Sequence, residues 1–409
     1  MRILQINVVY GEKSTGRICF EVEKYLNTHG DECYTAYGVG DKPSSMYAYR
    51  LENRFGYYIH NIFSKFTGLE GYFSYFGTKR LIKYIKKIKP DVIHLHNLHG
   101  HFVNIPMLFK FLGKTQTPVV ITLHDCWIFT GKCTHPTRTG CDKWKTQCSQ
   151  CPAKKEYPLS HTFDFSKKMF SDKKKLIERL NVKAVIGVSD WVADLAKQSF
   201  LNKFKILRLY NWVNRDVFKP YDKKSVLPVL SKYCVDKNKF TVICVAAAWA
   251  EDSQKNNELI NFAAKIGSDY QIIVIGQNSR SIKSDNVVPI DFISDIKELA
   301  MLYSFADVYV HFSVADTFGK VIAEAMACGT PAVVYDVSAC AELVKEGCGE
   351  KVEPHSTDAL VAAVRKIKSV GKEFYSSDCV KRVEEDFDYN KNMAKLRKIY
   401  QGDLSAENR

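Results

Sequence analysis

The sequence predicts two α/β domains, each built on a doubly wound parallel sheet. The chain has 409 residues, more than one ordinary hydrophobic core accommodates. Short apolar segments alternate along it with segments of helical periodicity, which is typical of βαβ units. Residues 119–123 and 271–275 are apolar nearly throughout, as expected of strands buried on both faces of a parallel sheet.

The same patterns place the individual elements. Strands are expected at residues 3–9, 32–37, 91–96, 118–123, 184–188, 240–246, 270–275, 287–290, 308–312 and 332–335, and helices at 16–29, 78–89, 296–305 and 323–328. A polar segment that ends in Pro220 separates the two sets, so we expect domains at 1–210 and 211–385. Ligands of such sheets bind at the carboxyl ends of the strands, which predicts a functional cleft between the domains.

The tail, residues 386–409, begins with a helical pattern and is expected to return to the first domain. Its apolar residues recur at helical spacing, at Met393, Leu396, Ile399 and Tyr400.

The net charge of +14 is unevenly distributed. Residues 1–220 contain 35 Lys+Arg against 18 Asp+Glu, a net charge of +17, whereas residues 221–409 contain 24 against 27, a net charge of −3. A basic first half suits an acidic substrate, anionic membrane lipid or nucleic acid, and the simpler alternative is solubility. No apolar stretch is long enough to span a bilayer and no signal-peptide pattern is present, so we expect a cytoplasmic protein.

Residues 313–331 carry the most specific pattern. They follow a predicted strand and lead into a helix that starts near Gly319, where a glycine lets a ligand approach and free N–H groups attract phosphate. Asp316 precedes the helix and Glu324 lies within it, and ionised carboxylates accept hydrogen bonds from sugar hydroxyls. The pattern predicts a site for an anionic sugar compound; the alternative is a helix cap and a surface charge.

This segment resembles the E-x7-E signature of the family 4 retaining glycosyltransferases, which have the GT-B fold. The resemblance implies a nucleotide-sugar donor and no cofactor for catalysis. By resemblance, Asp316 contacts the donor sugar and Glu324 binds the nucleotide ribose. The main-chain N–H groups that would hold the diphosphate are those of Phe318, Gly319, Lys320 and Val321. The family's first acid is usually glutamate, so the aspartate leaves the donor sugar undefined.

Two other segments carry the resemblance. Residues 245–249, followed by Lys255 and Asn256, resemble the family's diphosphate-binding motif without its arginine and second glycine. Lys255 is expected to neutralise phosphate charge as a point charge, and a solvated surface lysine is the alternative. Residues 211–214 resemble the family's Asn-Gly-Val-Asp hinge.

Histidines end two predicted strands of the first domain, where the cleft is expected. His94 and His96 close the strand at 91–96, and His124 with Asp125 follows the strand at 118–123. The family has a histidine near the reacting sugar at the second position, which His124 matches. We expect His124 to position the acceptor while the leaving phosphate takes the proton, and His94, His96 and Asp125 to lie on the acceptor side. A structural role is the alternative for each histidine.

The loop at residues 11–17 joins the first predicted strand to the first helix and resembles the family's N-terminal glycine-rich loop. Gly16 and Arg17 are expected to meet the donor diphosphate or an acceptor phosphate. The loop does not match the Gly-x-Gly-x-x-Gly fingerprint, which argues against a dehydrogenase.

Four of the thirteen cysteines follow a C-x7-C-x6-C-x2-C pattern shortly after Asp125. They are Cys133, Cys141, Cys148 and Cys151. Four thiolates in a loop of a reducing compartment favour a structural zinc site, and free thiols or disulfides are the alternatives.

Residues 54–89 combine aromatic side chains with lysines. A basic, aromatic and amphipathic face suits an anionic bilayer, where lipid-linked acceptors are found, and buried aromatics with solvated lysines are the alternative. The sequence therefore predicts a retaining hexosyltransferase that acts on a saccharide or lipid-linked acceptor in surface polysaccharide assembly, peripheral on the inner face of the cell membrane.

Two other functions remain open at this point. One is a nucleotide-sugar epimerase on the same fold, and the other is a nucleic-acid-binding protein, which the basic half suggests. The sequence contains no recognisable nucleic-acid-binding module and that function leaves the paired acids unexplained, so no nucleic-acid partner is expected.

Overall fold

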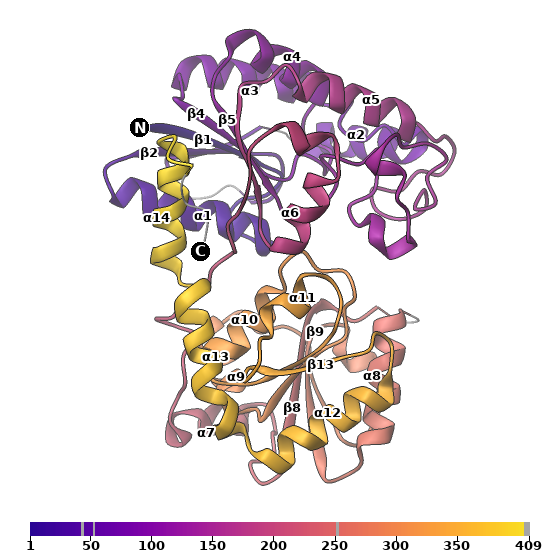
Figure 1. Ribbon diagram of the computed structural model, residues 1–409, viewed down its shortest axis with the longest axis vertical. Helices are drawn as coiled ribbons and strands as arrows, with labels where there is room; N and C mark the ends of the chain where they lie inside the picture. The colour runs from indigo at the N-terminus through magenta and orange to yellow at the C-terminus, as the bar shows by residue number, and fades with distance from the viewer. Residues whose placement is uncertain (42–44, 52–53, 251–252, 405–409) are drawn as a thin grey trace. The chain divides into compact units, whose positions relative to one another are not determined.

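The computed structural model describes residues 1–41, 45–51, 54–250 and 253–404 (Figure 1). The chain forms two compact units, Met1–Leu209 with Met393–Arg409, and Tyr210–Asn392. The sequence-based division began the returning segment at residue 386, whereas residues 386–392 belong to the second unit. Residues 405–409 of that segment lie outside the described residues.

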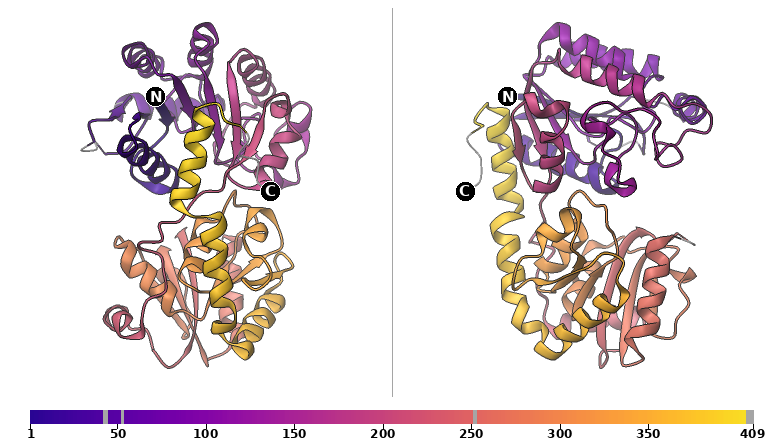
Figure 2. Two further views of the ribbon diagram at one scale, coloured as in Figure 1. Left: turned by 60° about the vertical axis from the view of Figure 1, so that its left-hand side comes forward. Right: turned by 45° about the vertical axis from the view of Figure 1, so that its right-hand side comes forward.

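The first unit is built on a seven-stranded parallel sheet with the strand order β3-β2-β1-β4-β5-β6-β7 (Figures 1 and 2). Its strands are β1 (Arg2–Asn7), β2 (Glu32–Tyr37), β3 (Ala48–Arg50), β4 (Val92–Leu95), β5 (Val119–Leu123), β6 (Val182–Gly187) and β7 (Ile206–Arg208). Its helices are α1 (Lys13–Thr28), α2 (Arg54–Thr67), α3 (Tyr75–Ile88), α4 (Ile105–Thr115), α5 (Ser166–Ile177) and α6 (Asp190–Lys197). Every residue of β4 and β5 is buried, as their apolar sequences require.

The second unit is built on a six-stranded parallel sheet with the order β10-β9-β8-β11-β12-β13. Its strands are β8 (Phe240–Ala248), β9 (Tyr270–Gln277), β10 (Val287–Ile290), β11 (Val308–His311), β12 (Ala332–Tyr335) and β13 (Gly349–Val352). Its helices are α7 (Lys223–Lys232), α8 (Gln254–Ile266), α9 (Ile296–Phe305), α10 (Lys320–Ala327), α11 (Ser338–Leu343), α12 (Thr357–Val370) and α13 (Lys372–Asp386). The predicted fold class, two doubly wound α/β units, is confirmed.

The last helix, α14 (Tyr389–Tyr400), joins the first unit through an apolar face and two polar contacts. Met393, Leu396 and Ile399 are buried, as their spacing predicts. The Tyr400 hydroxyl lies 2.6 Å from His94 Nδ1, and Arg397 Nε donates to Asp31 Oδ2 over 2.6 Å. Figure 1 shows this helix beside β1 and β2, so the C-terminal end of the chain completes the first unit.

Candidate functional site

The turn between β11 and α10 has the geometry of an anion site. Gly319 lies at the start of α10 with φ 79°, a conformation that side-chain-bearing residues rarely adopt. A Cβ at this position would stand 2.8 Å from Ile322 Cδ1, so the turn also has little space for one. Gly319 is the N-cap residue and supplies no side-chain cap to this helix start. The positive end of the helix dipole therefore lies behind a glycine turn.

Asp316 is held in this turn by the end of β11. Its Oδ2 lies 2.5 Å from His311 Nε2, and His311 Nδ1 lies 2.9 Å from the Tyr309 hydroxyl. The Cys340 thiol donates to the same carboxylate oxygen over 3.8 Å. The Asp316 side chain keeps 36% of its surface exposed, whereas that of His311 keeps 10%. A carboxylate that is fixed on one side and open on the other can accept hydrogen bonds from a ligand.

The other residues predicted to bind the donor, in and just before α10, differ in solvent exposure. Glu324 is buried, and Lys320 and Val321 are partly exposed. The Phe318 ring is buried against Tyr210 and Phe387, at centroid distances of 6.0 and 5.4 Å. The Phe318 side chain therefore belongs to the core, and only its main chain can take part in a site.

Lys255 follows a neighbouring strand, because β8 pairs with β11 in the sheet. Its Nζ donates to Ala248 O over 3.0 Å and lies 4.6 Å from the ring centroid of Trp249, which is itself buried. The carboxyl ends of β8 and β11 lie at one edge of the sheet, so Lys255 and the α10 turn are placed on the same side of this unit. Residues 251–252 of the intervening loop lie outside the described residues.

The predicted acceptor-side histidines form a buried cluster at the centre of the first sheet. His96 Nδ1 lies 2.9 Å from His124 Nε2, and His96 Nε2 lies 3.1 Å from Gln5 Oε1. His94 uses both ring nitrogens, with Tyr400 at 2.6 Å and Thr122 at 2.7 Å, which favours a structural role for it.

Burial keeps this cluster neutral. It lowers the pKa of His94 to about 3 and that of His124 to about 4, and it holds the pKa of His96 well below its ordinary value. The positioning role of His124 stays a prediction.

A second, ionic group lies beside the histidine cluster and includes His99, which the sequence analysis missed. Asp125 Oδ2 lies 2.6 Å from His99 Nε2, its Oδ1 accepts from Trp127 N over 2.8 Å, and His99 Nδ1 lies 3.0 Å from the Tyr157 hydroxyl. Burial alone would lower the pKa of His99, but the charge and hydrogen bond of Asp125 outweigh it and raise that pKa. Burial alone would raise the pKa of Asp125, but His99 outweighs it and lowers that pKa. His99 lies shortly after His94 and His96, beyond the end of the same strand, and this position could have identified it as a candidate from the sequence.

Gly16 and Arg17 occupy the start of α1. A Cβ on Gly16 would stand 3.1 Å from Tyr10 N, so glycine lets this helix pack closely against the preceding turn. The turn is closed by Gly11 N, which donates to Gly16 O over 2.9 Å. The Arg17 side chain is exposed and available to an anion.

The cysteine loop brings its outer members together. The Cys133 thiol hydrogen-bonds the sulfur of Cys151, which lowers the pKa of Cys151 to about 7. Cys148 Sγ accepts from Gly131 N over 3.1 Å, and Cys141 is half-buried.

Within the described part of the chain, two groups of three side chains have ligand atoms close enough together to hold a metal ion. One comprises His60, Glu70 and His101, and the other His311, Asp316 and Cys340. Neither includes a cysteine of the loop, so the zinc site stays a prediction.

Solved structures share this two-sheet architecture over nearly the whole chain. Sucrose-phosphate synthase from Thermosynechococcus elongatus matches with a TM-score of 0.70 at 14% identity, covering 100% of both chains. A glycosyltransferase from Rickettsia africae matches with a TM-score of 0.66 at 17% identity over 99% of both, and WaaG, a glycosyltransferase of lipopolysaccharide biosynthesis, with 0.66 at 15% over 98% of this chain and 100% of that one. The fold is therefore the GT-B fold.

Sequence comparison assigns the family within that class. Residues 16–217 match "Glycosyltransferase Family 4" and residues 239–369 match "Glycosyl transferases group 1". The chain belongs to the family 4 glycosyltransferases, a retaining family.

Curated relatives match parts of the chain. The putative colanic acid biosynthesis glycosyl transferase WcaC of Escherichia coli K12 is 25% identical over 66% of this chain and 66% of its own length. A GDP-mannose-dependent phosphatidylinositol dimannoside mannosyltransferase of Mycobacterium tuberculosis is 32% identical over 32% of this chain and 35% of its own. The chain thus spans about two thirds of WcaC. Across the described residues, we find no helix that combines the length and apolar character needed to cross a membrane.

Proposed function

We propose that this protein transfers a sugar, with retention of configuration, from a nucleoside diphosphate sugar to a saccharide or lipid-linked acceptor of surface polysaccharide assembly. The observation that carries the proposal is the α10 turn, where a helix start with Gly319 at its N-cap is flanked by Asp316 and Glu324. In this proposal the helix start holds the diphosphate, Glu324 binds the ribose and Asp316 contacts the sugar. WcaC, named for colanic acid biosynthesis, supports the acceptor class.

The choice of nucleotide base to test comes from the relatives and not from the geometry of the site. A structural neighbour from Anabaena, HepE, has been solved with UDP and with UDP-glucose, and the mycobacterial relative is named for GDP-mannose. Uridine and guanosine diphosphate sugars are therefore the first donors to test.

Protection against thermal unfolding by a panel of nucleotide sugars tests the donor assignment. A ligand at 100 times its dissociation constant stabilises the folded state by about 2.7 kcal/mol, so a true donor raises the unfolding midpoint. Glu324→Ala should lose this protection and keep its fold, whereas Asp358→Ala, which removes an exposed acid of the same unit, should retain it. Equal protection of the wild type and Glu324→Ala would contradict the donor site.

Product analysis separates transfer from epimerisation. We expect a new glycoside only when donor and acceptor are both present. Conversion of the donor to an epimer without any acceptor would replace the transferase proposal by the epimerase alternative.

We also propose that α2 binds an anionic membrane surface. One face of this helix carries exposed apolar side chains at helical spacing: Phe55, Tyr58, Ile59, Ile62, Phe63 and Phe66. His60 and Ser64, on the other face, are buried. The following helix α3 adds exposed lysines, among them Lys79 and Lys83, and this combination suits anionic lipid.

Sedimentation with vesicles of anionic and zwitterionic lipid tests the membrane surface. The wild type should bind the anionic vesicles at low salt, and Phe55→Ser/Ile62→Ser/Phe66→Ser should not. Val370→Ser/Phe374→Ser, which removes exposed apolar side chains of the second unit, serves as the control. Absence of wild-type binding at low salt would refute the proposal.

We propose a structural zinc ion held by Cys133, Cys141, Cys148 and Cys151. The contact between Cys133 and Cys151 and the lowered pKa of Cys151 support it, because zinc binds the thiolate form. Metal analysis of the purified protein should give about one equivalent of zinc, and less than about 0.1 equivalent would refute the site.

A further inference from the structure

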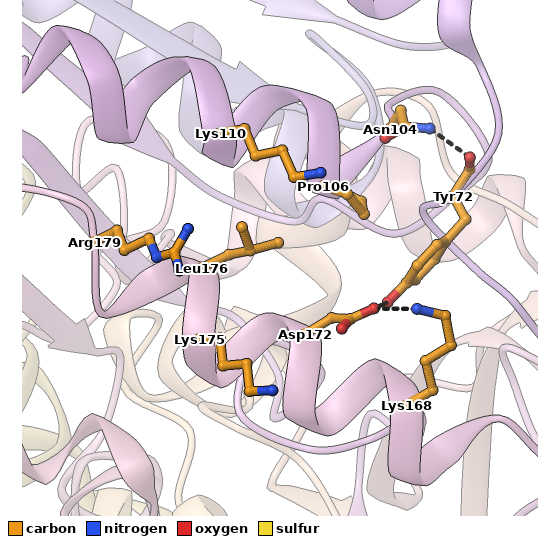
Figure 3. A pocket seen from close by; sticks show the side chains of 9 residues that line it. All are labelled: Tyr72, Asn104, Pro106, Lys110, Lys168, Asp172, Lys175, Leu176 and Arg179. Atoms are coloured by element: carbon orange, nitrogen blue, oxygen red, sulfur yellow. Dashed lines mark hydrogen bonds and ion pairs between the residues drawn. The ribbon is translucent and has the colours of Figure 1, made fainter.

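A pocket of 430 Å³ lies on the first unit between α4 and α5, and none of its lining residues has been assigned a role above (Figure 3). The two helices pack side by side and form its walls. Four cationic side chains line it: Lys110 from α4, Lys168 and Lys175 from α5, and Arg179 just beyond α5. Asp172 is the one acid among its lining residues. The lining therefore carries a formal net charge of +3, from four cations and one carboxylate.

The acid is already engaged by partners at one side of the pocket. Asp172 Oδ2 accepts from Lys168 Nζ over 2.6 Å and from the Tyr72 hydroxyl over 2.7 Å. Burial alone would raise the pKa of Asp172, but these two hydrogen bonds outweigh it and lower that pKa, so the carboxylate stays ionised. The charge of Lys168 is therefore balanced by the Asp172 carboxylate, and the net positive charge of the pocket comes from the three other cations.

Lys110, Lys175 and Arg179 make no ion pair with any carboxylate in the part of the chain that the structure describes. In Figure 3 their side chains surround the same opening. Cations that are gathered without counter-charges repel one another, and a bound anion removes that cost. An arginine beside two lysines suits phosphate oxygens, because guanidinium can bind two of them at once.

The rest of the pocket is fixed and partly apolar. Leu176, Pro106 and the Tyr72 ring supply apolar surface. The Asn104 side chain accepts from Met107 N over 2.9 Å and donates to Tyr72 O, which ties the Tyr72 segment to the start of α4. The volume is within the usual range for small-molecule sites, and larger than a single inorganic ion needs.

We propose that this pocket binds a phosphorylated ligand, with Lys110, Lys175 and Arg179 on its phosphate and Tyr72, Pro106 and Leu176 against its carbon skeleton. This site is separate from the donor site of the second unit and stands whether or not the transferase assignment holds. The phosphate belongs either to the headgroup of an anionic lipid or to a soluble phosphorylated compound. The lipid source fits the position of Tyr72 in the short segment that follows the exposed apolar helix α2.

A charge-matched pair of variants tests the pocket. Lys110→Glu/Arg179→Glu changes two pocket cations, and Lys223→Glu/Lys224→Glu makes the same change in charge on exposed lysines at the start of α7, outside the pocket and outside the proposed membrane surface. Lys110→Gln/Arg179→Gln is the milder pocket variant if reversal disturbs folding. Calorimetric titration with inorganic diphosphate at low salt is one arm, and sedimentation with phosphatidic acid vesicles is the other.

The proposal predicts that the pocket variants lose one class of diphosphate sites, or bind vesicles about tenfold more weakly, which corresponds to about 1.4 kcal/mol. The α7 variant should keep both kinds of binding. Loss in the diphosphate arm alone identifies a soluble ligand, and loss that includes the vesicle arm identifies the lipid headgroup. The proposal is overturned if the pocket and α7 variants behave alike in both arms, whether both retain binding or both lose it.

Discussion

The ion pair between His99 and Asp125 gives the first unit a pH-dependent contribution to stability. The pKa of Asp125 is lowered from 3.8, so its contribution is present above pH 3.8 and is lost as pH falls. The pKa of His99 is raised from 6.5, so its contribution is present below pH 6.5 and is lost as pH rises through the raised value. The pair is therefore fully effective between pH 3.8 and 6.5.

Asp125→Asn should lower the free energy of unfolding by about 3 kcal/mol at a pH inside this window, since a buried charge loses its partner. The loss should shrink above the raised pKa of His99. Urea denaturation at both pH values measures it, with Asp194→Asn, from an exposed surface pair, as the control. A loss that does not change with pH would contradict the ionic description.

The neutral histidine cluster should make stability depend on pH in the direction opposite to that of His99. His94, His96 and His124 have pKa values below the ordinary 6.5, so they stabilise the folded state at higher pH and lose that contribution as pH falls below 6.5. From pH 7.5 to pH 5, each fully neutral histidine should cost about 2 kcal/mol of unfolding free energy.

His94→Gln should therefore make the unfolding midpoint less sensitive to acid than in the wild type. His161→Gln, at an exposed position, should leave the sensitivity unchanged. Equal acid sensitivity of the wild type and His94→Gln would show that His94 is protonated in the folded protein.

At this scale the sequence predicts residue types better than it predicts contacts. Asp316 and Glu324 can be recognised in the sequence because they lie eight residues apart within a strand-turn-helix pattern. The hydrogen-bond partners of Asp316 and Asp125 cannot be recognised in the same way. His311 contacts Asp316 and His99 contacts Asp125 through side-chain geometry that the sequence spacing does not encode. Lys173 is a further example: it is buried, donates to Trp127 O over 2.5 Å and has a pKa lowered by burial to about 7, yet its sequence is an ordinary run of lysines.

Among the elements, the start of α10 has the most demanding backbone. Gly319→Ala places a Cβ in a conformation with φ 79° and 2.8 Å from Ile322 Cδ1, and should cost about 1–2 kcal/mol of stability. The turn must shift to relieve this, so donor diphosphate binding should also weaken. Gly267→Ala carries comparable strain, with φ 104° and no atom within 4 Å, at a position outside the site.

Both variants should lower the unfolding midpoint, and only Gly319→Ala should weaken nucleotide binding, by about tenfold or more. Thermal unfolding with and without nucleotide separates the two effects. If both variants bind nucleotide like the wild type, the α10 turn does not hold the diphosphate.

The interior strands of both sheets and the edge strand β10 were predicted, whereas the other three edge strands were not. β2, β10 and β12 have the predicted bounds. For β12, a continuous apolar sequence marks a strand that is buried throughout. β3, β7 and β13 were missed: they are three or four residues long and mostly half-exposed, so their sequences have no apolar run. The amphipathic pattern of α2 was recognised, but which of its faces is exposed depends on the packing of Glu70 and His101 against His60.

At the scale of the whole molecule, two chemically different units share one chain. The basic excess falls in the first unit, with the exposed face of α2 and the cationic pocket, and the paired carboxylates fall in the nearly neutral second unit. This division suits a protein whose first unit meets an acidic or membrane-bound acceptor and whose second unit holds the donor. The tail predicted to return to the first unit does so, because the apolar residues of α14 need a partner surface and Tyr400 reaches His94.

The most direct test of the donor site is calorimetric titration of UDP and GDP into the wild type and Glu324→Ala. One nucleotide should saturate a single site per chain in the wild type, and Glu324→Ala should bind it at least about tenfold more weakly at an unchanged unfolding midpoint. Absence of saturable binding of either nucleotide at millimolar concentration, or equal affinity in the two proteins, would contradict the assignment of the α10 turn as the nucleotide-sugar site.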